Sequence, residues 1–246
     1  MKLLIDIGNS RLKWAWCDKS TWQTSATAIN SQSPAALMAT VGEPHGVPRQ
    51  VGLVSVAALD LLDSMKHFIK DKWNIEPVLV ESVAQQAGVF NGYRDPGELG
   101  NDRWAALVAA RAETTAPVCI ISCGTATTID AMNDNGEFIG GSIFPGLEMM
   151  RRNLHQGTAG IQGTAGSDQS CQATSTADAV AAGTLFGLVG AINRVVTEHH
   201  RVLGNNCVNI LTGGSADMVS THLDFPVHAI HDLVLRGVKR ILEERP

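Results

Sequence analysis

The sequence predicts an α/β protein made of two similar halves with a cleft between them. Apolar strand patterns alternate along the chain with amphipathic helix patterns, which is typical of α/β architectures. The segment Leu4–Ala15 also aligns without gaps with Ile120–Ala131, as a duplicated unit would. With 246 residues, 44% hydrophobic and 17% charged, the chain can bury one large core or two modest ones. We therefore expect two like domains, residues 1–115 and 116–246.

The first half begins with a strand, a tight turn and a second strand. Leu3–Ile5 is an apolar run long enough for a buried strand, and Gly8 and Asn9 tolerate the backbone angles of a tight hairpin turn. Asp6 lies where the apolar run ends, so the pattern places one carboxylate beside a glycine turn. Further along are strand patterns at 51–56 and 78–80 and, between them, an amphipathic helix pattern formed by Leu62, Met65, Phe68 and Ile69.

The second half repeats this beginning with different polar residues. Ser122 stands where the first copy has Asp6, and Gly124 stands where it has Gly8. The later elements are a strand bracketed by turn formers at 140–146, a long helix beginning near Ser175, a strand at 207–211 closed by Gly213 and Gly214, and a C-terminal helix carrying Ile230, Val234, Val238 and Ile241. The same alternation of strands and helices thus runs through both halves.

Charge, hydropathy and cysteine spacing exclude several classes of partner. The net charge of −5 and the pI near 5.9 provide no basic surface for a phosphate backbone, so we expect no nucleic-acid partner. No apolar stretch approaches the roughly 20 residues of a membrane helix, and the first residues show a strand pattern in place of a signal peptide. We expect a cytoplasmic protein without membrane association. The five cysteines form no CxxC pair, which suits reduced thiols.

The two glycine turns are candidate phosphate-binding sites. Glycine lets the main chain approach a phosphate without a Cβ in the way. Hydroxyl donors near the turns are Ser10, Thr125, Thr127 and Thr128. The carboxylate of Asp6 is an oxygen ligand of the kind that Mg²⁺ shares with substrate phosphates. Neither GxxxxGK[ST] nor GxGxxG occurs. The alternative is two ordinary β-hairpins, but two aligned copies favour phosphate binding.

A third stretch pairs an acid with an arginine at the start of a helix. Asp102 and Arg103 directly precede an apolar helix face formed by Trp104, Leu107 and Val108. Asp102 is either a helix cap or the group that accepts the proton of an alcohol attacking phosphorus. Arg103 either forms a surface ion pair or holds a substrate carboxylate in a bidentate fork.

Five short motifs together resemble the type III pantothenate kinase family. They occur in the family's order and spacing, from residue 1 to about 242: Asp6-x-Gly8-Asn9-Ser10, Gly100-x-Asp102-Arg103, Gly124-Thr125-Ala126-x-Thr128, Gly140-Gly141-x-Ile143-x-Pro145-Gly146 and Thr212-Gly213-Gly214. Each motif is weak alone, but five in register are specific. The resemblance implies two duplicated ribonuclease-H-like domains of the acetate and sugar kinase, heat-shock chaperone and actin superfamily, with ATP bound between them.

The resemblance also implies an activity and its residues. It implies an ATP-dependent kinase that phosphorylates the primary hydroxyl of pantothenate, with Asp102 as the base and Mg²⁺ near Asp6. The implied ATP-binding residues are Asp6, Ile7, Gly8, Asn9, Ser10, Arg11, Leu12, Lys13, Gly124, Thr125, Gly213 and Gly214. The implied pantothenate-binding residues are Tyr93, Gly100, Asn101, Asp102, Arg103 and Thr176, the last with an N-cap as its alternative role. Because a second subunit completes the family's active site, the resemblance implies a homodimer.

One position departs from the family pattern. The family usually reads Asp-x-Gly-Thr-Ala where this chain reads Ser122-Cys123-Gly124-Thr125-Ala126. The family's aspartate is associated with a monovalent cation, K⁺ or NH₄⁺. A serine hydroxyl can ligate a cation but brings no charge. We therefore expect a K⁺ dependence weaker than is usual in the family.

Two other functions fit the same implied fold. A regulator such as the Bvg accessory factors of this family would keep the fold while its activity is incidental. A related small-alcohol or sugar kinase would use the same ATP site. The presence of Asp6, Asp102 and Arg103 favours the enzyme, because a pure binding module has no need for this acid and arginine pair. The histidine pairs at 199–200 and 228–231 lack the surroundings of a zinc site.

Overall fold

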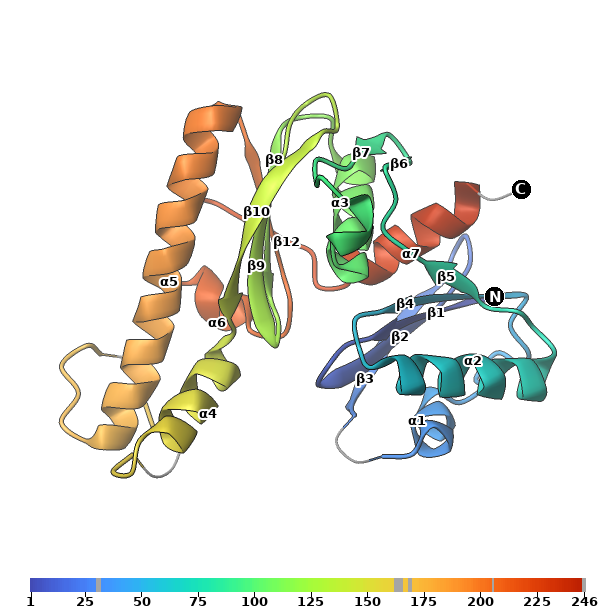
Figure 1. Cartoon of the computed structure of the whole chain (residues 1–246), viewed down its shortest axis with the longest axis horizontal. Helices are drawn as coiled ribbons and strands as arrows, with labels where there is room; N and C mark the ends of the chain where they lie inside the picture. The colour runs from blue at the N-terminus through green and yellow to red at the C-terminus, as the bar shows by residue number, and fades with distance from the viewer. Residues whose placement is uncertain (30–31, 162–165, 168–169, 205, 245–246) are drawn as a thin grey trace. The chain divides into compact units, whose positions relative to one another are not determined.

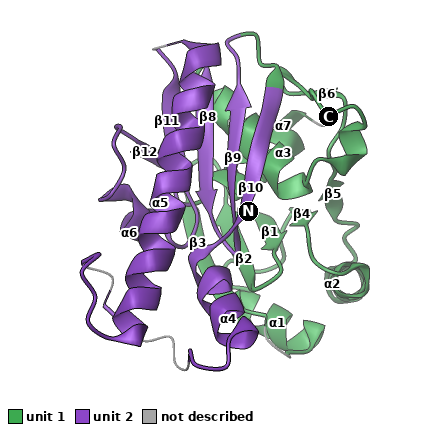
Figure 2. Ribbon diagram, turned by 60° about the vertical axis from the view of Figure 1, so that its left-hand side comes forward, with its two compact units in different colours: residues 1–115, 135–138, 232–246 green, residues 116–134, 139–231 purple. Residues whose placement is uncertain are grey.

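The chain folds into two compact units (Figure 2). The computed structural model describes residues 1–29, 32–161, 166–167, 170–204 and 206–244. Unit 1 comprises residues 1–115, 135–138 and 232–246, and unit 2 comprises residues 116–134 and 139–231. The chain first passes from unit 1 to unit 2 after Thr115, at the expected boundary, but two later segments return to unit 1.

Unit 1 contains a five-stranded mixed sheet with the strand order β3-β2-β1-β4-β5. β1 is antiparallel to β2 and parallel to β4. The strands are β1 (Lys2–Ile7), β2 (Arg11–Cys17), β3 (Trp22–Ala28), β4 (Gln50–Ser55) and β5 (Val78–Val80). A two-stranded ribbon of β6 (Gln85–Gln86) and β7 (Val89–Phe90) and a short 3-10 helix (Pro96–Glu98) follow β5. The strands expected in the first half are thus confirmed.

Helices cover both faces of this sheet (Figure 1). α1 (Pro34–Val41) and α2 (Leu59–Trp73) share a core with one face of β1, β2 and β4. α3 (Asn101–Glu113) and α7 (Leu233–Glu244) pack on each other and against β1 and β4 on the opposite face. Side chains alternate between the faces of a strand. Since Ile5 and Ile7 lie in the core under α1 and α2, Asp6 faces the side of α3.

Unit 2 repeats the sheet of unit 1 in the same order, β10-β9-β8-β11-β12. β8 is antiparallel to β9 and parallel to β11, as β1 is to β2 and β4. The strands are β8 (Val118–Cys123), β9 (Ala126–Met132), β10 (Phe138–Pro145), β11 (Val208–Thr212) and β12 (His228–Ala229). The duplicated fold that the sequence predicts is therefore confirmed.

Three helices belong to unit 2: α4 (Leu147–Gly157), α5 (Thr176–Leu203) and α6 (Ala216–Ser220). α5 and α6 share a hydrophobic core with β8, β9 and β11, in which Leu185, Ile192 and Val219 are buried. By length and composition α5 is able to cross a membrane, so the expectation that no such stretch exists is wrong. Half of its most apolar stretch is buried within the structure, however, which is the pattern of a core helix.

The two hairpins that form the sequence repeat differ in the length of their turns. In unit 1 three residues separate Ile7 from Arg11, and Gly8 N donates to the Arg11 carbonyl oxygen at 3.0 Å. In unit 2 only two residues separate β8 from β9, and Gly124 N donates to the Ala126 carbonyl oxygen at 3.1 Å. The gap-free alignment therefore holds for the first strand of each copy and is wrong by one residue in the second.

This one-residue correction changes which side chains are equivalent in the two copies. Lys13 lies opposite Asp6 in unit 1, and Thr128 lies opposite Ser122 in unit 2. A shift of one residue moves every side chain of a strand to the other face of the sheet. The charged pair of the first hairpin is thus replaced by a pair of hydroxyls in the second.

The C-terminal helix belongs to unit 1, whereas the sequence expectation placed all of 116–246 in one domain. Its small residue Gly237 is the reason for the close contact, because a Cβ there would overlap the backbone of Ala105 in α3. The helix also begins later than expected. Ile230 lies outside it and donates its N–H to the Leu211 carbonyl oxygen of β11 at 2.8 Å.

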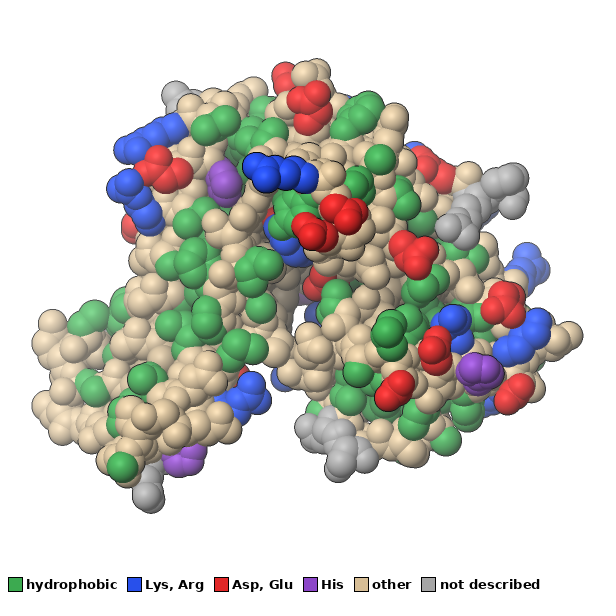
Figure 3. Space-filling model, viewed as in Figure 1, with side chains coloured by type: hydrophobic (Ala, Val, Ile, Leu, Met, Phe, Trp, Pro, Cys, Tyr) green, Lys and Arg blue, Asp and Glu red, His purple; other side chains and the backbone are tan. Residues whose placement is uncertain are grey.

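The surface agrees with the acidic composition. On the face drawn in Figure 3, Lys and Arg side chains are interspersed with Asp and Glu and form no continuous basic area. Some charged side chains of the described residues are paired, as Glu198 is with Arg194 at 2.6 Å and with Arg201 at 2.8 Å. All five cysteines are free thiols, as their spacing predicts.

Candidate active site

Asp6 is a buried carboxylate near the end of β1. It is only 6% exposed. The antiparallel register places Lys13 opposite it, with Lys13 Nζ 3.9 Å from Asp6 Oδ2. The hairpin around Gly8 therefore holds an acid and a cation side by side at the start of the glycine turn.

The first turn of α3 is tied to the end of the sheet where Asp6 lies. Asn101 Nδ2 donates to the carbonyl oxygen of Ser55, the last residue of β4, at 3.3 Å. Asn101 Oδ1 accepts the N–H of Ser82 at 2.9 Å. Because β4 pairs in parallel with β1, these bonds place Asp102 at the same end of the sheet as Asp6.

Asp102 lies inside the first turn of α3 and is not its cap. The N-cap is Gly100, which makes no side-chain capping bond. Asp102 Oδ1 accepts the backbone N–H of Arg103 at 2.8 Å. A Cβ on Gly100 would stand 2.9 Å from Asp102 Oδ1, so glycine leaves room for the carboxylate. The helix-cap alternative is therefore wrong.

The two acids act on each other electrostatically. Burial raises the pKa of Asp6 to about 6, the ammonium of Lys13 opposes that rise, and the charge of Asp102 adds to it. Asp6 and Asp102 are therefore within electrostatic reach of one another in unit 1. A buried acid whose pKa is raised beside a second acid is typical of functional sites.

Arg103 is a buried arginine held by aromatic side chains. It is 6% exposed, so the surface-ion-pair alternative is wrong. Its Nη1 donates to the hydroxyl oxygen of Tyr93 at 2.9 Å. Its guanidinium carbon lies 5.6 Å from the ring centre of Tyr93 and 5.7 Å from that of Phe138. The structure thus brings together Arg103 and Tyr93, two of the implied substrate-binding residues.

Asn91 positions Tyr93, a role that the sequence alone does not predict. Its Oδ1 accepts the N–H of Tyr93 at 3.0 Å. Its Nδ2 donates to Ser82 Oγ at 3.0 Å and to the Pro96 carbonyl oxygen at 3.2 Å. A single asparagine in a loop gives no periodic signal. The polar turn residues around it indicate only that the segment is a turn.

In unit 2, three glycine-containing segments meet at the second hairpin. Gly146 N donates to the Thr125 carbonyl oxygen at 3.0 Å, and a Cβ on Gly146 would overlap the Gly124 carbonyl oxygen. Gly213 has a φ of 100°, and a Cβ there would overlap the backbone of Cys123. The implied ATP-binding residues of this half are therefore neighbours, and Gly146 joins them.

The position of Ser122 is lined by hydroxyls. Ser122 is paired with Thr128, whose Oγ1 is buried and has no hydrogen-bond partner among the described residues. Thr127 Oγ1 is also buried without a hydrogen-bond partner among the described residues, but Thr127 is paired with Cys123 and faces the other side of the sheet. Buried hydroxyls are normally hydrogen-bonded. Neutral oxygens thus stand where the family's carboxylate would be.

Thr176 opens α5 in unit 2 but does not cap it. The cap is Ser175, whose Oγ accepts the N–H of Asp178 at 3.2 Å. Thr176 itself is exposed. The N-cap alternative for Thr176 is wrong, and its side chain is accessible to a ligand.

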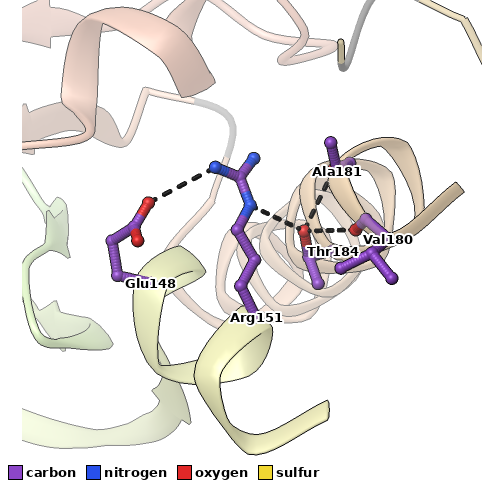
Figure 4. Close-up of polar contacts among 5 residues, drawn as sticks. All are labelled: Glu148, Arg151, Val180, Ala181 and Thr184. Carbon is purple, nitrogen blue, oxygen red and sulfur yellow. Dashed lines mark hydrogen bonds and ion pairs between the residues drawn. The ribbon is translucent and has the colours of Figure 1, made fainter. Parts of the chain in front are cut away.

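Arg151 connects α4 to α5 (Figure 4). Its Nε donates to Thr184 Oγ1 at 3.2 Å, and its Nη1 donates to Glu148 Oε1 at 3.3 Å. The hydroxyl of Thr184 lies 2.8 Å from the Val180 carbonyl oxygen, to which it donates. This link holds α4, whose cap Gly146 touches the second hairpin, against the long helix.

A groove of about 450 Å³ in unit 1 lies away from this site. It is lined by the turn between β2 and β3 and by residues of α3 and α7. Four residues of β2 separate Lys13 from Asp18 in that turn, and this length of strand spans roughly 17 Å. Its charges pair with one another, as in Arg236 with Glu113 at 3.5 Å. The groove is therefore separate from the candidate active site.

Comparisons with known proteins agree with this geometry. A family model described as type III pantothenate kinase matches residues 2–198. A curated relative named type III pantothenate kinase, from Nitrosospira multiformis, is 34% identical over 243 residues, which cover 98% of this chain and 91% of the relative.

Solved structures share the fold at lower identity. The acetate kinase of Porphyromonas gingivalis has a TM-score of 0.54 and 11% identity, covering 98% of both chains. A Campylobacter jejuni protein, described as a conserved candidate transcriptional activator of the Baf family, has a TM-score of 0.61 and 22% identity. That match covers 99% of this chain and 98% of the other. These two structures support the duplicated kinase-type fold.

Proposed function

Because the chain belongs to the type III pantothenate kinase family, we propose that it transfers the terminal phosphoryl group of ATP to the primary hydroxyl of pantothenate. The product is 4′-phosphopantothenate, and the reaction is the first step of coenzyme A biosynthesis. The observation that carries the proposal is the pair of acids at one end of the unit 1 sheet, in which the charge of Asp102 helps to raise the pKa of the buried Asp6. Phosphoryl transfer to an alcohol uses one acid on the metal and phosphate side and one on the alcohol side.

Asp102 is the acid on the alcohol side in this proposal. The hydroxyl oxygen of pantothenate bonds to the terminal phosphorus while the bond from that phosphorus to the ADP oxygen breaks. The hydroxyl proton passes to the Asp102 carboxylate. A carboxylate of low basicity suffices, because the transition state is loose and the proton leaves late. Arg103, held by Tyr93, would bind the carboxylate of the substrate.

Asp6 is the ligand that we propose for Mg²⁺. Its buried oxygens suit a hard cation, and a nearby cation would keep the acid ionised despite burial. Among the residues that the structure describes, no group of three His, Cys, Asp or Glu side chains could hold a metal. Mg²⁺ would therefore bind Asp6 together with the phosphates of ATP, whose charge it neutralises. Lys13 and the turn at 8–10 would contact those phosphates.

Ser122 and the Thr128 hydroxyl opposite it can ligate a monovalent cation, but they bring no charge where the family has an aspartate. We propose that activity is nearly independent of K⁺. Initial rates in KCl, NH₄Cl and NaCl are expected to differ by less than about threefold in the wild type. Ser122→Asp restores a charged ligand and is expected to make the rate more dependent on K⁺ or NH₄⁺.

The matched control for this prediction is Thr128→Val, which removes the hydroxyl opposite Ser122 without adding charge. This variant is expected to show the same flat salt response as the wild type. A steep K⁺ dependence of the wild type, equal to that of Ser122→Asp, would show that other oxygens have rebuilt the cation site.

A homodimer and a cytoplasmic location are also proposed, since both follow from the family. The dimer is proposed because the family resemblance implies that a second subunit completes the active site. Analytical ultracentrifugation with and without substrates tests the dimer.

The proposed reaction is tested with the purified chain, MgATP and pantothenate. ADP release is expected to require pantothenate and to match the amount of phosphorylated product. If no acceptor is phosphorylated, the result favours a regulatory role. If other small alcohols or sugars are phosphorylated in preference to pantothenate, the result favours a related kinase function.

A further inference from the structure

The side chain of Asn101 connects the first turn of α3 to two other segments of unit 1. Its Nδ2 donates to the Ser55 carbonyl oxygen at 3.3 Å, and its Oδ1 accepts the N–H of Ser82 at 2.9 Å. Ser55 is the last residue of β4, and Ser82 lies two residues after β5, the parallel neighbour of β4. A bond at each end of a planar amide fixes both its position and its orientation. Asn101 therefore joins the helix to the carboxyl ends of two strands.

Both points of attachment are themselves held in place. Ser55 is 6% exposed and lies opposite Ile7 in the pairing of β1 with β4. The next residue, Val56, donates its N–H to the Ile7 carbonyl oxygen at 3.1 Å. At the other attachment, Ser82 Oγ accepts a hydrogen bond from Asn91 Nδ2 at 3.0 Å. The start of α3 is thus tied to the strand end that follows Asp6.

α3 begins without the type of cap that other helices of the chain have. Ser33 and Ser175 cap α1 and α5 with their side-chain oxygens, whereas the N-cap of α3, Gly100, makes no side-chain capping bond. Asparagine also has a lower helix propensity than alanine. Asn101 therefore adds little to the helix by local effects, and its bonds to other segments are its structural contribution.

We propose that Asn101 is a positioning residue that sets the place of the Asp102 carboxylate and acts on the reaction through Asp102. This inference rests on the proposed function. The family resemblance assigns Asn101 to pantothenate binding, but in the structure its amide bonds run to the backbone of β4 and of the segment after β5. Asp102 is the next residue of the same turn, so a shift of the turn moves its carboxylate away from the alcohol oxygen. A misplacement of about 1 Å can lower a rate by roughly a hundredfold.

The test compares Asn101→Ala with the wild type in phosphorylation of pantothenate by MgATP. The variant loses both amide bonds and gains a residue of higher helix propensity. We expect kcat to fall about 10- to 100-fold. KM for ATP, KM for pantothenate and the calorimetric Kd for pantothenate are expected to stay within about threefold, because no direct ligand of either substrate is removed.

Two variants separate positioning from general loss of stability. Asn101→Gln keeps an amide donor and acceptor on a longer side chain and is expected to recover part of the kcat that Asn101→Ala loses. Ile69→Val removes a methylene from α2, where Ile69 is fully buried in the core on the opposite face of the sheet. It is expected to lower Tm while kcat stays that of the wild type.

A double-mutant cycle shows whether Asn101 acts through Asp102. In the Asp102→Asn background, Asn101→Ala is expected to lower the remaining kcat by less than about threefold, since the group that it positions is already inactive. A drop as large as in the wild-type background would mean that Asn101 acts on the reaction by another route, and it overturns the inference.

The kinetic constants also distinguish the remaining outcomes. If Asn101→Ala raises KM and Kd for pantothenate about tenfold with kcat unchanged, Asn101 is a direct ligand and the inference is overturned. A lower Tm with kcat within about twofold of the wild type overturns it as well, because the bonds then serve stability alone. In both cases the wild type still phosphorylates pantothenate, so only the inference fails. If the wild type neither binds nor phosphorylates pantothenate, the proposed function fails and the inference fails with it.

Discussion

Asp102→Asn is expected to lower kcat by roughly 10²- to 10⁴-fold while the Kd for ATP stays within about twofold. Asparagine has the size of aspartate and accepts hydrogen bonds, but it cannot take the proton of the attacking hydroxyl. Removing the charge of Asp102 also removes one cause of the raised pKa of Asp6, so the proposed metal ligand stays ionised. Steady-state kinetics and equilibrium nucleotide binding measure the two effects separately.

The control for this prediction is Glu98→Gln, which neutralises an exposed acid just before α3. Its kcat is expected to match that of the wild type. An Asp102→Asn variant that keeps more than about a tenth of the wild-type kcat would mean that another group removes the proton.

Asp6→Asn is expected to stabilise the folded chain near pH 7.5 while it abolishes Mg²⁺-dependent activity. The folded pKa of Asp6 is about 6, against 3.8 for an ordinary aspartate. At pH 7.5 Asp6 is therefore ionised in both states, but its charge is buried only in the folded state. Burial of this charge destabilises the folded state. The difference between the two pKa values corresponds to at most about 3 kcal/mol of unfolding free energy. Asp6→Asn is expected to raise the unfolding free energy by up to this amount.

The sign of the pH dependence follows from the direction of the pKa shift. Between about pH 4 and pH 6 the folded state binds a proton at Asp6 that the unfolded state has released. Stability from this group is therefore greatest at low pH, falls as the pH rises through this range, and is fully lost above about pH 6. Asp6→Asn removes this contribution, so its advantage is expected to appear above pH 4 and to reach its maximum above pH 6.

Thermal denaturation between pH 4 and pH 8, with and without MgATP, tests the Asp6 prediction. MgATP is expected to raise Tm of the wild type more than that of Asp6→Asn, because the variant lacks the proposed ligand. Asp63→Asn serves as the control, since its side chain is 59% exposed in α2. If Asp63→Asn gains as much stability at pH 7.5 as Asp6→Asn, burial is not the cause.

The sequence predicts the hairpins and the acids well because their signals are local. The apolar run before Asp6 and the glycine turn after it define a hairpin within a dozen residues, and the same signal recurs before Gly124. The lengths of the two turns are not visible in that signal. A turn of two or three residues satisfies the same glycine pattern, so the register of Lys13 and Thr128 emerges only from the strand pairing.

Contacts between distant segments are the part that the sequence does not predict. Gly237 packs on Ala105 across more than a hundred residues, and Phe138 reaches Arg103 from a segment beyond the first half. Neither residue has a pattern that distinguishes it from any glycine in a helix or any aromatic in a strand. Their roles follow from the packing of whole helices and strands. The hydrophobic periodicity of the sequence carries no information about that packing.

The route of the backbone through the two units has a consequence for dissecting the protein. The chain passes between them four times, after Thr115, Asp134, Phe138 and His231. No single cut yields two separate halves. A fragment ending at Thr115 would lack both the helix α7, which covers Gly52 of its sheet, and Phe138, whose ring centre lies 5.7 Å from the guanidinium carbon of Arg103. A contiguous fragment of the chain therefore cannot represent either unit by itself. Exchanging a unit with that of a relative requires several simultaneous junctions.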